Sequence, residues 1–126
     1  TIDFIVRKFG VEALYEIFTR VGRDVYRDLH DHLAAGDTNE LARHWRHFFE
    51  REDADFDIAI IGDEIVLTVR RCTAWHHVAK IAPKVSPYFC DQTIKTNEAM
   101  AAGTPFAIAT EVTGPGSCRQ VIRRKA

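Results

Sequence analysis

The sequence lacks an excess of charge of either sign and lacks any long hydrophobic run. Seventeen Lys and Arg residues stand against 18 Asp and Glu, for a formal net charge of −1. This balance predicts no basic surface for nucleic acid or anionic membranes. No run approaches the about 20 apolar residues that a transmembrane helix needs, and no signal peptide is visible. We therefore expect partners other than nucleic acid and membranes.

Cysteine is scarce, with three residues in the chain: Cys72, Cys90 and Cys118. An odd number cannot all pair within one chain, which argues against a secreted disulfide scaffold and favours a reducing, cytoplasmic location. The spacing CxxC does not occur, so the usual zinc-ribbon and thioredoxin signals are absent. The cysteines are better regarded as free thiols.

The residues that are present predict one globular domain over residues 1–126, because 46% of them are hydrophobic and 28% are charged. Apolar residues recur at three- and four-residue steps between Gly10 and Gly36, which predicts one long amphipathic helix there. A second helix is expected from Thr38 to about Arg51, with Asp37 and Glu40 at capping-box spacing. The first half of the chain is therefore expected to be helical.

The second half of the chain predicts strands and shorter helices. Residues 57–61 and 64–71 are β-branched runs joined by two turn residues, which indicates a hairpin, and 105–113 and 118–124 form another around GPGS. Between the hairpins we expect helices at 73–82 and from Pro87 to about Ala102, the latter capped by Ser86. The fold class is α+β: an antiparallel sheet from two β-hairpins packed against N-terminal and central helices.

Cys90 lies in the stretch SPYFCDQT, inside the first turns of the helix that we expect to start at Pro87. Backbone N–H groups and the helix dipole would favour a thiolate there and lower its pKa. Asp91 follows it and is interpreted as an orienting or acid/base group. The alternative is that Cys90 is a buried apolar residue, since free cysteine is among the most buried residue types.

Cys72 and His76 are four residues apart across a strand-to-helix junction, so both side chains could face one side. Such a pair serves as nucleophile and base, or as two metal ligands. His77 competes with His76 for the inward position, and the alternative is a solvated histidine pair beside a core cysteine. Because the three cysteines lie at ends of elements, they could meet at one end of the sheet. His44 and His47 are interpreted as solvated.

The second half also resembles a known family. VRRC at a strand end, YFCDQT at a helix start and GPGSC before the last strand resemble the L-2-amino-thiazoline-4-carboxylic acid hydrolase family, as does the opening FGVEAL. Cys72, Cys90 with Asp91, and Cys118 occupy the matching places. The resemblance implies a hydrolase acting on a C–N bond of a small cyclic substrate, with the thiazoline ring opened to S-carbamoyl-cysteine.

We therefore expect a cysteine-containing hydrolase with a small-molecule substrate, and self-association into a homo-oligomer remains open. Its expected catalytic residues are Cys90, Asp91, Cys72 and His76, and its expected substrate contacts are Cys118 and His77. No cofactor is expected, with zinc or iron held by the cysteines as the alternative. A second resemblance, to vinyl-reductase-like small-molecule-binding domains, implies a sensor of ligand or metal without catalysis.

Overall fold

The computed structural model describes residues 1–82 and 84–125, which form six helices and four strands. The helices are α1 (Ile2–Phe9), α2 (Val11–Asp24), α3 (Arg27–Ala34), α4 (Asn39–Arg51), α5 (Thr73–Ile81) and α6 (Asp91–Ala101). The strands are β1 (Asp55–Ile61), β2 (Glu64–Arg71), β3 (Phe106–Gly114) and β4 (Ser117–Arg124). The predicted α+β fold, with two hairpins and helices on both sides of the first hairpin in sequence, is confirmed.

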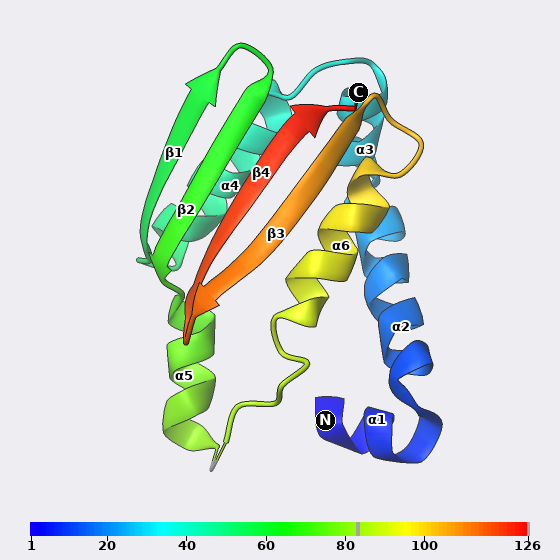
Figure 1. Ribbon diagram of the computed structural model, residues 1–126, viewed down its shortest axis with the longest axis vertical. Coiled ribbons are helices and arrows are strands. Elements are labelled where there is room, and N and C mark those ends of the chain that lie inside the picture. The colour runs from blue at the N-terminus through cyan, green and yellow to red at the C-terminus, as the bar shows by residue number, and fades with distance from the viewer. Residues whose placement is uncertain (83, 126) are drawn as a thin grey trace.

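The four strands form one antiparallel sheet in the order β1-β2-β4-β3 (Figure 1). Gly62 and Asp63 connect β1 to β2 as predicted, and Gly62 has a φ of 60° that glycine adopts at little cost. The two hairpins meet along β2 and β4, where Val69 lies opposite Cys118. This register places the C-terminal end of β2 beside the start of β4.

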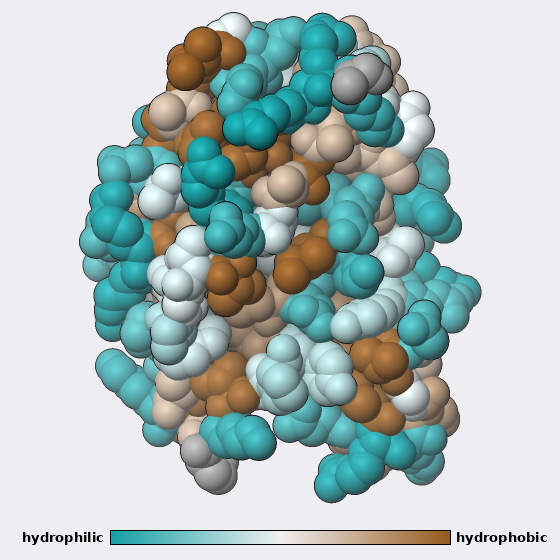
Figure 2. Space-filling view, in the orientation of Figure 1, coloured by the Kyte–Doolittle hydropathy of each residue, from teal (hydrophilic) through white to brown (hydrophobic). Residues whose placement is uncertain are grey.

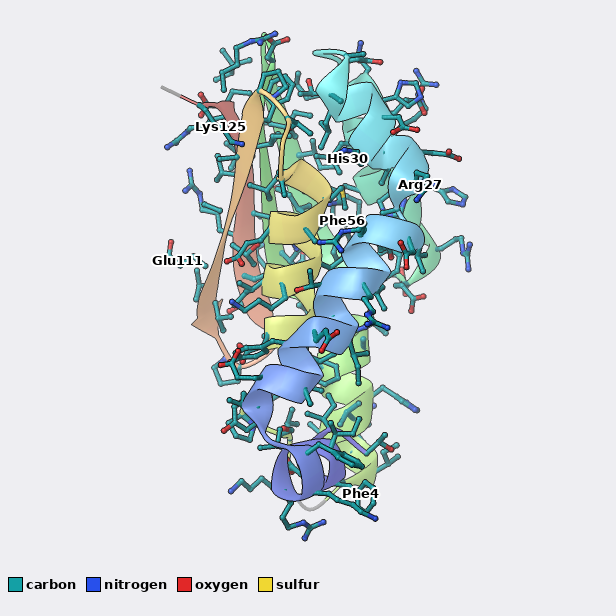
Figure 3. The ribbon with its side chains drawn as sticks, turned by 90° about the vertical axis from the view of Figure 1, so that its right-hand side faces the viewer. Phe4, Arg27, His30, Phe56, Glu111 and Lys125 are labelled. Atoms are coloured by element: carbon teal, nitrogen blue, oxygen red, sulfur yellow. The ribbon has the colours of Figure 1, made fainter. Side chains whose placement is uncertain are left out.

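The helices cover one face of the sheet. Helix α6 lies against β3, and α2 packs on α6, so sheet, α6 and α2 follow one another as layers (Figures 1 and 3). Helix α4 covers the β1–β2 half, where its buried Leu41, Trp45 and Phe49 join Ile65 and Leu67 in one apolar core. Burial of alternate strand residues and of one helix stripe is what the sequence pattern requires.

The other face of the sheet is open to solvent and carries charged pairs. Arg70 on β2 forms ion pairs with Asp55 and Asp57 on β1, and Arg123 pairs with Glu64. Figure 3 shows Glu111 pointing away from the helices on this side, and Figure 2 shows hydrophilic side chains over much of it. Among the described residues, no helix is both long and apolar enough to cross a bilayer.

The prediction of one long helix between Gly10 and Gly36 is wrong, because helix α2 ends at Asp24 and a separate helix, α3, begins at Arg27. Val25 is 70% exposed at this break, although its spacing suggested an inward position. The break turns the ring of Tyr26 onto that of His44, with centroids 5.3 Å apart. Helix α1 is an additional element that the pattern did not predict.

The helix predicted from Pro87 is also wrong at its start, since α6 begins at Asp91. Ser86 caps a turn instead: its Oγ accepts a hydrogen bond from the N–H of Tyr88 at 3.2 Å, and the N–H of Phe89 donates to its carbonyl. Ser-Pro starts turns as readily as helices. Cys90 is consequently the N-cap residue of α6 and does not lie inside its first turns.

Candidate functional site

The three cysteines come from different elements and line one pocket. Cys72 follows β2 and is the N-cap of α5, Cys90 is the N-cap of α6, and Cys118 is the second residue of β4. The N–H of Cys72 donates to the carbonyl of Gly116 at 2.7 Å, which ties the end of β2 to the turn before β4. All three thiols are free and half-buried, and all three line the same pocket.

The pocket lies between the sheet, α4 and α6, and has a volume of about 320 Å³. This is the lower end of the range found for small-molecule sites. Six aromatic side chains line it: Tyr26, Trp45, Phe48, Phe49, Trp75 and Phe89. Val112, which is 46% exposed, and the exposed Gln92 also line it and mark its rim. The lining is therefore mainly apolar, with a solvent-accessible mouth.

A hydrogen-bonded polar network crosses the pocket wall. The Nδ2 of Asn97 donates to Oε1 of Gln120 at 2.7 Å and to Oγ1 of Thr110 at 3.0 Å. The Nε2 of Gln120 in turn donates to Sγ of Cys118 at 3.6 Å. Asn97 and Gln120 are 4% and 3% exposed. Buried amides of this kind give an apolar pocket a fixed polar end.

The sequence pattern did not predict this network. Its only signal was that Thr110 and Gln120 stand two residues from the buried Ile108 and Ile122, which puts them on the inner face of their strands. Asn97 lies three residues before Met100 on α6.

The thiols of Cys90 and Cys118 are held in their protonated form. Burial raises the pKa of the Cys90 thiol, and the neighbouring Cys118, Cys72 and Asp91 raise it further. Burial also raises the pKa of Cys118, against the opposing hydrogen bond from Gln120. The prediction that a helix N-terminus lowers the pKa of Cys90 is therefore wrong, because burial and like charges outweigh the dipole at this position.

Asp91 is next to Cys90 but belongs to a different contact. The hydroxyl of Tyr15 donates to its Oδ2 at 2.8 Å, and this hydrogen bond is the main reason that the pKa of Tyr15 is raised to about 12. The ammonium of Lys95 lies 4.8 Å from the centre of the Tyr15 ring. Asp91 thus links α6 to α2 and is not among the residues that line the pocket.

The two predicted histidines also lie outside the lining. His76 packs on the turn before β4, where a Cβ added to Gly116 would come 2.7 Å from its Nε2, and its ring meets Trp75 edge-on. His77 is exposed. Neither lines the pocket, so the roles given to them stay predictions without a pocket contact.

His44, by contrast, lines the pocket and was wrongly interpreted as solvated. Its ring lies between those of Tyr26 and Phe48. Burial, followed by the charge of His47, lowers its pKa. The imidazole is therefore neutral at neutral pH and presents both a donor and an acceptor nitrogen.

Metal binding by the cysteines stays a prediction. Across residues 1–82 and 84–125, no group of three or more His, Cys, Asp or Glu side chains is arranged closely enough to hold an ion. Three tetrahedral ligands at about 2.3 Å from zinc would require the thiols to approach one another.

Comparison with protein-family models, curated proteins and solved structures finds no match to this chain. The class that fold and site define is accordingly a structural one: an α+β domain whose sheet and helices enclose a mainly apolar pocket with three thiols and a buried amide pair.

Proposed function

We propose that this chain binds a small organic molecule in the pocket between the sheet, α4 and α6. The observation that carries the proposal is the combination of six aromatic side chains with the buried Asn97–Gln120 pair in one pocket of about 320 Å³. Apolar walls with a few fixed polar groups are the usual composition of ligand sites. This makes the chain a binding or sensor domain in the first instance.

Binding is favoured over hydrolysis because the thiols of Cys90 and Cys118 are not activated. A cysteine nucleophile needs a lowered pKa or an adjacent base, whereas the pKa values of Cys90 and Cys118 are raised. The two groups predicted to move protons, Asp91 and His76, do not line the pocket.

The test is a calorimetric screen of small aromatic compounds against the wild-type protein and Cys118→Phe, which fills the pocket. Ala107→Phe is the matched control, because Ala107 is exposed on β3 and does not line the pocket. Compounds that bind wild type and Ala107→Phe should lose binding to Cys118→Phe. Binding that persists in a folded Cys118→Phe protein, as judged by circular dichroism, would place the ligand elsewhere.

Hydrolysis of a C–N bond in a small cyclic substrate is the second candidate function, supported by the meeting of three thiols and the neutral imidazole of His44 in one pocket. A neutral imidazole can accept a proton from a thiol or a water. Turnover of 2-amino-thiazoline-4-carboxylate, measured as S-carbamoyl-cysteine, should then fall at least 100-fold in Cys72→Ala, Cys90→Ala or His44→Ala. Absence of turnover in the wild-type protein would remove this candidate and leave the binding proposal intact.

A further inference from the structure

The pocket lining is uncharged. Charged residues make up 28% of the chain, yet among the described residues no Asp, Glu, Lys or Arg lines the pocket. Charged side chains stand nearby but face elsewhere, as Asp91 does towards Tyr15. The exclusion of charge is thus a property of this surface and not of the chain's composition.

Three titratable groups in the pocket, Cys90, Cys118 and His44, are neutral as well. The thiols of Cys90 and Cys118 are protonated because burial raises their pKa values, and His44 is uncharged because burial lowers its pKa. A ligand in this pocket would therefore meet hydrogen-bond donors and acceptors but no carboxylate, ammonium, guanidinium or imidazolium group.

The walls and the polar network differ in the contacts that they offer. Trp45 and Phe49 from α4, and Trp75 from α5, present flat aromatic surface, which stacks on or meets planar rings edge-on. Asn97 and Gln120 offer amide groups from α6 and β4, held in place by their mutual hydrogen bond. One end of a ligand would meet rings and another would meet amides.

We infer that the ligand is an uncharged planar ring compound with a hydrogen-bonding group at one end, and that carboxylates are excluded. The inference rests on the proposed function, because it specifies the ligand of the same pocket. A carboxylate in this site would lose its hydration without gaining a cation, which is strongly unfavourable. The carboxylate substrate that the hydrolase resemblance implies is disfavoured for the same reason.

The experiment compares benzamide with benzoate, two planar molecules of nearly equal size that differ in charge, by calorimetric titration at pH 7.5. Benzamide should bind the wild-type protein at least tenfold more tightly than benzoate. Equal or tighter binding of benzoate would overturn the inference and leave the proposed function standing. Binding of neither compound at 10-mM ligand, roughly the weak limit of a fragment site, would count against both.

A variant that adds a cation at the rim makes the comparison sharper. Val112→Lys puts an ammonium at the mouth of the pocket on a side chain that is already 46% exposed, so folding should be retained. It should tighten benzoate binding several-fold relative to benzamide binding measured on the same variant. Ile61→Lys, at a 75% exposed position outside the pocket lining, is the control and should change neither. No gain for benzoate in Val112→Lys would contradict an exclusion based on charge.

Discussion

Asn97 on α6 and Gln120 on β4 are joined through a hydrogen bond of 2.7 Å between Nδ2 and Oε1, and both side chains are almost fully buried. The pair connects the helical layer to the sheet across the pocket wall and reaches Cys118 through the second amide. A buried polar link of this kind fixes the position of α6 relative to β4, because each group needs its partner.

Replacing one member of the pair should therefore destabilise the protein. Asn97→Ala leaves Oε1 of Gln120 without its donor, which costs about 1–3 kcal/mol of unfolding free energy. Urea unfolding measures the change. Asn39→Ala, at an exposed position on α4, is the control and should remain within about 0.5 kcal/mol of wild type.

The double variant Asn97→Leu/Gln120→Leu tests the coupling itself. Removing both polar groups leaves no unpaired amide. The double variant should therefore lose less unfolding free energy than the sum of the losses in Asn97→Leu alone and Gln120→Leu alone. Additive losses would show that the two side chains do not stabilise each other.

Gly22 on α2 should not tolerate alanine. In an ordinary helix interior this change stabilises by about 1 kcal/mol. Here the added Cβ would lie 2.5 Å from the backbone carbonyl oxygen of Thr96 and 2.9 Å from Cβ of Ala99 on α6, so the helices must separate at a cost of about 1–3 kcal/mol. Thermal and urea unfolding should show a less stable protein, whereas Arg23→Ala on the exposed side should be near neutral; a stabilised Gly22→Ala would contradict the close helix packing.

The raised thiol pKa values predict slow alkylation at neutral pH. The rates at which Cys90 and Cys118 react with iodoacetamide are followed by peptide mass spectrometry as a function of pH. In the folded protein these rates should rise at higher pH than in protein unfolded in urea, where a free thiol has a pKa of about 8.5. A Cys90 that titrates below the unfolded thiol would restore the thiolate interpretation.

The same shift makes stability depend on pH with a defined sign. The unfolded thiols release their protons at lower pH than the folded ones, so this contribution is complete below the pKa of the unfolded thiol and is lost as pH rises above it. The loss of urea stability between pH 7 and pH 10 should be smaller in Cys90→Ala than in wild type. An equal loss of stability in both proteins would mean that burial does not raise the pKa of the Cys90 thiol.

Tyr15 should ionise at higher pH than an ordinary tyrosine, because ionisation breaks its hydrogen bond to Asp91 and places two negative charges together. Ultraviolet titration of the three tyrosines should show a step at about 12 that is lost in Tyr15→Phe. Asp91→Asn should move this step down towards 10. Asp3→Asn is the control, because the carboxylate of Asp3 accepts a hydrogen bond from Ser86 and not from Tyr15, and it should leave the step in place. A step unaffected by Asp91→Asn would contradict the contact between Tyr15 and Asp91.

Local signals predicted the hairpins and the fold class, since a two-residue turn between β-branched runs specifies its own geometry. The pairing of β2 with β4 depends on residues about 50 positions apart, such as Val69 and Cys118. No local pattern encodes that pairing, so the strand order could not be derived from the sequence. The predicted helix start was wrong where one motif occurs in two structures: Ser86-Pro87 can begin a helix, but here Ser86 caps a turn.

Only part of the candidate site could be predicted, because no local pattern encodes tertiary packing. Cysteines at ends of elements suggested that Cys72, Cys90 and Cys118 converge, and they do line one pocket. The direction of each side chain depends on tertiary packing, which turned Asp91 to Tyr15 and His76 to Gly116. Asn97 and Gln120 looked like ordinary polar residues until the fold brought them to one hydrogen bond.

The assignment of the ligand pocket can be tested by protection of the thiols with a bound neutral compound. Iodoacetamide labelling of Cys72, Cys90 and Cys118 is measured by peptide mass spectrometry at pH 8.5 over a series of benzamide concentrations. If one ligand pocket is lined by all three thiols, their labelling should slow in parallel, with one half-saturating concentration for all. Labelling that benzamide leaves unchanged, or that slows at one cysteine alone, would contradict the assignment of this pocket as the ligand site.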